Sequence, residues 1–121
     1  MSVFLSIIIP AYNERDRLPK TLRDVSRYLS NAQFTSEVIV VNDGSQDKTE
    51  GVAREEGSKI KNFKVIGDTK NHGKGWAVRE GMKVAEGEWR LFMDADNSTT
   101  IDQFENFLPL YLVYAQNSCV N

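Results

Sequence analysis

Four short apolar runs divide the chain. Residues 3–9 and 37–41 are β-branched or apolar at nearly every position, which is typical of strands that are buried on both faces. Residues 63–66 and 89–93 form two shorter runs of the same kind. The pattern therefore predicts four strands, and Pro10 is predicted to end the first of them.

Between these runs, apolar residues recur with the spacing of a helix. After the first strand, apolar side chains recur four, three and four positions apart, at Leu18, Leu22, Val25 and Leu29. A second helix is predicted to begin with a capping box, in which Asp47 is the N-cap and Glu50 reaches back, and to end at Gly57. A third helix is predicted over residues 76–86, with Gly87 just past its end.

A last amphipathic segment follows the fourth strand. Thr100 is a plausible N-cap for it, and its apolar side chains precede Pro109 at Ile101, Phe104, Phe107 and Leu108. Residues 110–121 show no clear pattern of either kind. The periodic part of the chain therefore extends from residue 3 to about residue 108.

Strands and helices alternate along the chain, which is the signature of an α/β fold with a doubly wound, mainly parallel, Rossmann-like sheet. In the common order of such a sheet the strands lie as three, two, one, four, and ligands bind where that order reverses. The loops at residues 10–14 and 94–98 would meet there, with Asp43 one strand away. We therefore expect a binding site at this edge.

Composition sets limits on the class of protein. The chain has 121 residues, with 15 basic and 17 acidic side chains and a net charge of −2, so one domain and no nucleic-acid partner are expected. The sole cysteine, Cys119, has no second cysteine to pair with. No secretion signal and no run of about 20 apolar residues is visible, so we expect a cytoplasmic protein.

Two carboxylates stand at the carboxyl end of the fourth run. On an extended chain, Asp94 and Asp96 would emerge on the same face. Neighbouring carboxylates repel each other, so the pair predicts a positive partner, either a hard divalent ion or a Lys or Arg side chain. The structural alternative is an ordinary polar turn after a strand.

Three other polar or aromatic residues are candidates for holding a nucleoside. Asp43 can accept hydrogen bonds from the N–H edge of uracil or guanine, or it can form an Asx-turn with Gly44 and Ser45. Tyr12 can stack on a base or ribose, or it is simply an aromatic residue at the rim. Glu14 can accept from a ribose hydroxyl, or its charge interacts with the N-terminus of the following helix.

The string Gly73-Lys74-Gly75 stands before a predicted helix, where backbone N–H groups and the Lys74 charge can hold a pyrophosphate. The alternative is a solvated loop lysine. No GxxxxGK[ST] string and no GxGxxG after the first strand occur, which argues against ATP and NAD sites. His72 is the only histidine, so a histidine-based triad or multi-histidine zinc site is excluded within this chain, and we expect it to be exposed.

Four ordered segments, at residues 6–14, 40–49, 71–75 and 94–96, resemble the donor-site motifs of the family 2 inverting glycosyltransferases. This family has the nucleotide-diphospho-sugar transferase (GT-A) fold. Within it, Arg17-Leu18-Pro19 and residues 94–100 are most similar to the dolichyl-phosphate glucosyltransferase branch of the polyprenyl-phosphate sugar transferases. Asn42, where many members have a second Asp, and Ser98, where related mannosyl enzymes have Gln, depart from the pattern.

The resemblance implies a set of contacts to a nucleotide sugar, made by Pro10, Ala11, Tyr12, Glu14, Asp43, Lys74, Asp94, Ala95 and Asp96. Lys74 would lie near the phosphates, and Ala95 would contact the nucleotide through its backbone. Asp94 and Asp96 would hold Mg²⁺ or Mn²⁺, which would neutralise the departing nucleoside diphosphate, and Asp96 would be the catalytic residue.

The implied reaction transfers a hexose from UDP-glucose or GDP-mannose to an acceptor, a polyprenyl phosphate, with inversion. Family members continue with an acceptor-binding half, so residues 1–121 are expected to be a single nucleotide-sugar-binding domain that ends before it. The full-length parent would then act at the cytoplasmic face of a membrane. Alternatives are a non-catalytic binding or assembly module and a nucleotidyltransferase. Apolar surface left uncovered predicts association into homo-oligomers.

Overall fold

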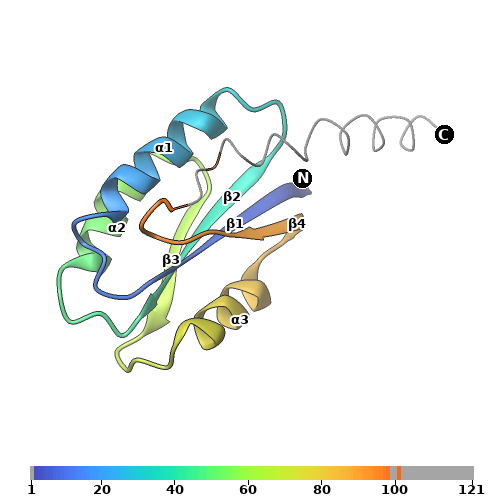
Figure 1. Ribbon diagram of the computed structural model, residues 1–121. Coiled ribbons are helices and arrows are strands. Elements are labelled where there is room, and N and C mark those ends of the chain that lie inside the picture. Colours follow the sequence, from blue (N-terminus) through green and yellow to red (C-terminus); the bar gives the residue numbers. More distant parts are fainter. Residues whose placement is uncertain (1, 99–100, 102–121) are drawn as a thin grey trace.

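A computed structural model describes residues 2–98 and residue 101 of the chain (Figure 1). Its elements are β1 (Val3–Ala11), α1 (Leu18–Ser30), β2 (Ser36–Asp43), α2 (Thr49–Gly57), β3 (Phe63–Asp68), α3 (Lys74–Val84) and β4 (Gly87–Phe92). The strands form one sheet in the order β3-β2-β1-β4, and every neighbouring pair is parallel. The predicted fold class and strand order are confirmed.

The two central strands are buried on both faces. Leu5, Ile7 and Ile9 of β1 pack beneath α1 and α2, whereas Ile8 of the same strand faces α3. Figure 1 shows α1 and α2 together on one side of the sheet and α3 on the other. Because successive side chains of a strand point to opposite faces, a strand between two helical layers needs apolar residues at every position.

The predicted first helix is confirmed. Leu18, Leu22 and Val25 of α1 are buried in the larger core, and Leu29 is partly buried against it. A stripe with this spacing covers one side of a helix, and this side faces the sheet.

Pro10 does not end the first strand, so that prediction is wrong. β1 continues through Pro10 to Ala11, in register with Val41 and Asn42 of β2. The Ile8 carbonyl accepts a hydrogen bond from Met93 N at 3.0 Å, so the backbone groups of Ile8 face β4. Alternate residues of a strand face the same neighbour, so the backbone of Pro10 also faces the β4 side. Since β4 ends at Phe92, opposite Ile8, the missing N–H of Pro10 removes no hydrogen bond between strands.

Gly87 does not follow a helix end, as had been expected. The third helix lies two residues earlier than predicted, over Lys74–Val84, and Gly87 is the first residue of β4. A Cβ atom at Gly87 would come within 2.5 Å of Ser6 Oγ on the neighbouring strand. Glycine is therefore needed here for close approach of the two strands, and not as a helix cap.

The predicted capping box does not form. The helix begins at Thr49, and its N-cap residue, Lys48, makes no capping hydrogen bond through its side chain. Asp47 accepts instead from Thr49 N at 2.9 Å, and Glu50 accepts from Asn42 Nδ2 at 3.2 Å. Gly57 is the last residue of α2, as predicted.

Part of the last predicted helix lies outside the described residues. Ile101 is described, and it is buried in the larger core. Thr100, Phe104, Phe107, Leu108 and Pro109 are not described, and neither is Cys119. Within residues 2–98 and 101, no helix has both the length and the apolar character that crossing a bilayer requires.

Candidate functional site

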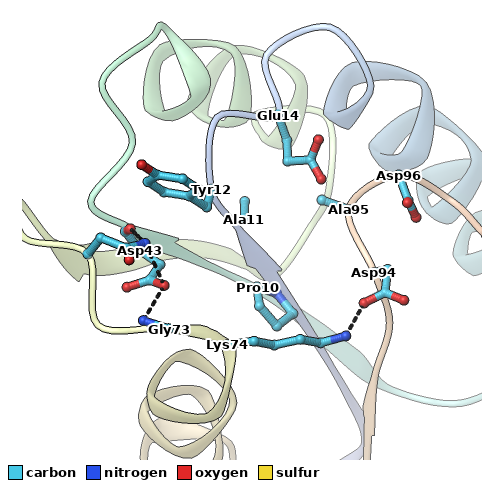
Figure 2. Close-up of a pocket in the computed structure, with 11 residues that line it drawn as sticks. Pro10, Ala11, Tyr12, Glu14, Asp43, Gly73, Lys74, Asp94, Ala95 and Asp96 are labelled. Carbon is cyan, nitrogen blue, oxygen red and sulfur yellow. Dashed lines mark hydrogen bonds and ion pairs between the residues drawn. The ribbon is translucent and has the colours of Figure 1, made fainter.

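A pocket of about 350 Å³ lies at the carboxyl ends of β1 and β4, where the strand order reverses (Figure 2). This volume is in the range of small-molecule sites. The pocket is lined by eleven residues: Pro10, Ala11, Tyr12, Glu14, Asp43, Asn71, Gly73, Lys74, Asp94, Ala95 and Asp96. The set includes all nine residues predicted to contact a nucleotide sugar, and it adds Asn71 and Gly73. The predicted convergence of the loops is therefore confirmed.

The loop that follows β1 is hydrogen-bonded to the loop that follows β2. Asn13 N donates to Ser45 Oγ at 2.9 Å, and Gln46 N donates to Asn13 Oδ1 at 2.8 Å. Glu14 N donates to Thr49 Oγ1 at 2.8 Å. Asn13 has φ +52°, a conformation that asparagine tolerates better than most residues. These contacts hold the loop that follows β1 against the loop that follows β2.

Pro10, Ala11 and Tyr12 lie between the Asp43 side and the Asp94 side of the pocket (Figure 2). The Tyr12 side chain lies at the rim and is 46% exposed. An exposed ring bordering a pocket is available for stacking, and it is equally a rim aromatic, so both interpretations of Tyr12 remain predictions.

Glu14 lines the pocket and forms an ion pair with Arg17. Its carbonyl accepts a hydrogen bond from Leu18 N, the first residue of α1, at 2.8 Å. Glu14 lies just before the first turn of α1, which itself contains no acidic residue. Its carboxylate is paired with a neighbouring guanidinium, and both interpretations of Glu14, as a ribose contact and as a charge near the helix N-terminus, stay predictions.

Asp43 holds the loop that precedes α3. Its carboxylate accepts from His72 N at 2.7 Å, from Gly73 N at 2.9 Å and from Asn71 Nδ2 at 3.1 Å. The residue is only 3% exposed. Asp43 therefore connects the end of β2 to Gly73-Lys74-Gly75, the segment predicted to hold a pyrophosphate. The sequence pattern did not reveal this connection.

Asp43 does not form the predicted Asx-turn with Gly44 and Ser45. Ser45 N donates instead to Asn42 Oδ1, three residues earlier, at 3.1 Å, so that alternative is wrong. Gly44 has φ +74°, and a Cβ there would lie 2.4 Å from Asn71 N. Only glycine suits this close approach of the two loops.

Lys74 is the first residue of α3 and not a loop residue, but its side chain is 57% exposed, so the alternative of a solvated lysine stays open. Its ammonium forms an ion pair with Asp94 across the pocket, which Figure 2 marks with a dashed line. The preceding residue, Gly73, has φ +99°, a conformation that favours glycine. Lys74 is therefore a positive partner of Asp94, one of the two kinds that were expected for the acid pair.

The two acids do not stand on an extended chain, so that expectation is wrong. The strand ends at Phe92, and Asn97 N donates to the Asp94 carbonyl at 3.2 Å, which closes a turn. Asp96 accepts a hydrogen bond from Ser98 N at 3.0 Å. Hydrogen bonds from the Ser98 side chain and backbone hold the pKa of Asp96 below its ordinary value, so this carboxylate is ionised at neutral pH.

The donor chemistry of this turn fits a hard divalent cation. Asp94 and Asp96 supply carboxylate oxygens, the ligands that Mg²⁺ and Mn²⁺ prefer. No group of three or more His, Cys, Asp or Glu side chains with the arrangement of a metal site occurs in the described part of the chain. An ion here would need further oxygens from a ligand or water, as is common for Mg²⁺ at phosphate sites.

His72 is exposed, as predicted, but its side chain has two partners. Nε2 lies 2.7 Å from Asp68 Oδ2, and the ring stacks on Trp76 with centroids 4.2 Å apart. The hydrogen bond with His72 is the main reason that the pKa of Asp68 is lowered. These contacts hold the loop against the start of α3.

Two residues of α1, missed by the sequence analysis, hold the acidic turn. Thr21 Oγ1 donates to the Ala95 carbonyl at 2.6 Å, and Asn97 Nδ2 donates to Asp24 Oδ2 at 2.9 Å. The available signal was a threonine within an otherwise apolar stripe, three residues after Leu18.

A curated relative is similar over most of the chain. The chain is 42% identical over 109 residues to a dolichyl-phosphate beta-glucosyltransferase of Trichomonas vaginalis. The match covers 86% of this chain and 34% of the relative. The chain therefore spans about a third of the length of the curated relatives it matches.

Solved structures share the fold. TarS of S. aureus in complex with UDP-GlcNAc is 29% identical, with a TM-score of 0.73 over 86% of this chain and 30% of that one. Glucosyl-3-phosphoglycerate synthase of Mycobacterium tuberculosis, solved with Mn²⁺, UDP and glucosyl-3-phosphoglycerate, is 24% identical. Its TM-score is 0.63 over 77% of this chain and 33% of that one, which supports the fold alone.

The family model described as Glycosyl transferase family 2 matches residues 6–120. This range contains every residue that lines the pocket. The chain therefore belongs to glycosyl transferase family 2.

Proposed function

We propose that this chain is the donor-binding part of an inverting hexosyltransferase that transfers glucose from UDP-glucose to a polyprenyl phosphate of the dolichyl type. The observation that carries the proposal is the pocket, where all nine expected contact residues converge at the reversal of the strand order. The similarity to dolichyl-phosphate beta-glucosyltransferases supports the choice of glucose and of the acceptor class. Residues 1–121 would form a single nucleotide-sugar-binding domain.

The Asp43 side of the pocket would hold the nucleoside. A carboxylate offers about four acceptor positions, and the loop uses three of them, so one remains for the imide N–H of uracil. Tyr12, at the rim, can stack on the base or the ribose. Pro10 and Ala11 would lie beneath the nucleotide.

The Asp94 side would hold the diphosphate. Asp94 and Asp96 would bind Mg²⁺ or Mn²⁺, which when bound supplies Lewis-acid stabilisation to the leaving diphosphate. Lys74 would interact with the phosphates from the start of α3, where helix geometry also favours anions. Asp96 would be the catalytic residue through its contact with the metal, and the Ala95 backbone would border the nucleotide.

The acceptor would itself supply the nucleophile, an oxygen of its phosphate group. A phosphate monoester is anionic near neutral pH, so it can attack the anomeric carbon without a strong protein base. The new glycosidic bond forms as the bond to the nucleoside diphosphate breaks. A lipid acceptor would place the whole protein at a membrane surface, and we propose its cytoplasmic face.

The family assignment argues against one of the two alternative functions and leaves the other open. The nucleotidyltransferase alternative loses its support, because the chain belongs to a glycosyltransferase family. A non-catalytic module with the same pocket would bind the donor and transfer nothing. Transfer of glucose to dolichyl phosphate by the full-length parent is the measurement that separates it from an enzyme.

Calorimetry tests the donor site directly. UDP-glucose and GDP-mannose are titrated into the chain with Mn²⁺, with Mg²⁺ and with a chelator. We expect UDP-glucose to bind more tightly with a divalent cation and more tightly than GDP-mannose. If neither donor binds in a metal-dependent way, the donor-site proposal is refuted.

A further inference from the structure

Helix α1 presents two polar side chains to the turn that carries Asp94 and Asp96. We propose that Thr21 and Asp24 are positioning residues, which set the geometry of this acid pair and with it the affinity for a divalent cation. The inference rests on the proposed function, because it assigns a role to α1 in that same site. Neither residue lines the pocket, so both would act through the turn.

Thr21 is the stronger anchor. It is fully buried at a position that the apolar stripe of α1 would give to an aliphatic residue, between Leu18 and Val25. Its hydroxyl lies 2.6 Å from the Ala95 carbonyl and 3.2 Å from the Arg17 carbonyl. A hydroxyl has one proton, and the shorter contact indicates that Ala95 receives it.

The Ala95 carbonyl depends on the hydrogen bond from Thr21, because it is buried. Ala95 is 2% exposed, so its carbonyl cannot exchange the hydrogen bond for water without movement of the turn. Loss of the Thr21 hydroxyl would leave a buried acceptor without that donor. The turn would then shift to find another one, and both flanking carboxylates would move with it.

Asp24 provides a second anchor, three residues further along α1. It accepts from Asn97 Nδ2 at 2.9 Å. The hydrogen bond from Lys20, 3.0 Å away, is the main cause that lowers the pKa of Asp24, so the acceptor is charged at neutral pH. Asn97 has φ +61°, which the contact helps to maintain.

The two anchors lie on either side of Asp96. Residue 95 is held through its carbonyl and residue 97 through its side chain, and Asn97 N also bonds the Asp94 carbonyl at 3.2 Å. The direction of the Asp96 carboxylate is therefore set by α1 as well as by β4. Because metal–ligand distances are defined to about 0.2 Å, a small movement of this turn would weaken cation binding.

Thr21→Val and Thr21→Ser test the proposal. Valine has nearly the same shape but no hydroxyl, whereas serine keeps the donor. Groups that orient metal ligands typically contribute 10- to 100-fold in affinity, so Thr21→Val should weaken Mn²⁺ binding in the presence of UDP about tenfold. Thr21→Ser should stay within about threefold of the wild type, and UDP binding in chelator should change less than Mn²⁺ binding in both variants.

Ser6→Ala is the matched control. Ser6 is also fully buried, and its hydroxyl donates to Glu37 Oε2 at 2.6 Å, but it lies near the opposite end of the sheet. Its loss should lower the midpoint of urea unfolding and leave Mn²⁺ affinity unchanged. A general loss of stability therefore cannot imitate the expected result.

A spectroscopic measurement and a second variant complete the test. The EPR spectrum of Mn²⁺ bound with UDP should change in Thr21→Val and return to the wild-type form in Thr21→Ser. Asp24→Ala, at a partly exposed position, should fold and should weaken Mn²⁺ about threefold. Unchanged Mn²⁺ affinity in both Thr21→Val and Asp24→Ala would overturn the positioning role while leaving the donor site intact. Absence of Mn²⁺-dependent UDP binding in the wild type would overturn both proposals.

Discussion

The two walls of the pocket are supported in different ways. One wall, proposed above to hold the nucleoside and called the nucleoside wall, consists of loops that follow β1, β2 and β3. Side chains of one loop accept backbone N–H groups of another. The acidic wall is a single turn after β4, one of the two edge strands, and it is held mainly by α1. Most residues of β4 are exposed, whereas β2 is almost entirely buried.

This difference indicates that the walls can be disrupted separately. A wall made of three loops that support one another fails when a shared acceptor is lost, as at Asp43. A wall made of one turn fails when its anchors or its charges change. Variants of the first wall should therefore change nucleoside binding and stability together, and variants of the exposed charges of the second should change cation binding with little effect on stability.

Asp43→Ala should have the largest effect. It removes the acceptor of three hydrogen bonds from Asn71, His72 and Gly73. Hydrogen bonds to a charged group contribute about 1.5–3 kcal/mol each, so the free energy of unfolding should fall by about 4.5 kcal/mol or more. Urea unfolding measures the stability, and calorimetry should show UDP binding weakened about a hundredfold.

Asp43→Asn is the control for this prediction. Its remaining carbonyl oxygen can accept from only part of the loop, so stability and UDP affinity should lie between those of the wild type and Asp43→Ala. Equal UDP affinity in all three proteins would show that the nucleoside wall does not depend on this acceptor.

Asp96→Ala should have the next largest effect, confined to the other wall. UDP-glucose affinity in Mn²⁺ should fall at least about tenfold, to its value in chelator, because one of two carboxylate ligands is lost. Stability should change by less than about 0.5 kcal/mol, since the side chain is exposed. Asp16→Ala removes the same charge from an exposed position away from the pocket and should change neither quantity. Retention of full Mn²⁺ dependence in Asp96→Ala would exclude a metal role for this residue.

Lys74→Gln should affect both ligands of the acidic wall in opposite directions. Without the ammonium, Asp94 loses its ion pair, so Mn²⁺ alone should bind about threefold more tightly. UDP in chelator should bind about fivefold more weakly, because a charge near the phosphates is lost. Lys83→Gln, which removes an exposed ion pair with Glu80 on the same helix, is the control, and calorimetry measures both affinities. Equal shifts in the two lysine variants would contradict the prediction.

The smallest expected effect is on the stability of the protein at low pH. Asp24 has a pKa below its ordinary value near 3.8, mainly through its hydrogen bond with Lys20, and in part through Asn97. A lowered carboxyl pKa contributes stability that is fully present above that ordinary value and is lost as the pH falls through the lower, folded value. Urea unfolding at pH 5 and pH 3 should therefore show a smaller drop for Asp24→Asn than for the wild type. An identical drop in both proteins would mean that Asp24 does not link stability to pH.

The fold and part of the pocket lining could be predicted from the sequence for one physical reason. Buried parallel strands are recognisable as continuous apolar runs, and their carboxyl ends must meet at one edge. This argument places Tyr12, Asp43 and Asp94 together, whereas the position of Lys74 near them was implied by the resemblance to a known family. Strand ends were less predictable, because Pro10 is tolerated only where the neighbouring strand has already ended.

The supporting contacts could not be predicted, because they join residues far apart in the sequence. Thr21 and Ala95 are 74 positions apart, and Asp43 is 30 positions from Gly73. No local pattern specifies such pairs, although a threonine in an apolar stripe indicates that some buried acceptor is near. The metal, the catalytic role of Asp96 and self-association remain predictions.

The several partners of Asp43 constrain how this pocket can change over evolution or by design. A substitution that alters which base fits beside residue 43 also releases the N–H groups of His72 and Gly73, and so moves the start of α3 with Lys74. The preference for a base and the contact with the phosphates would therefore change together. An engineer who wishes to exchange one donor nucleotide for another would need to redesign residues 71–73 at the same time.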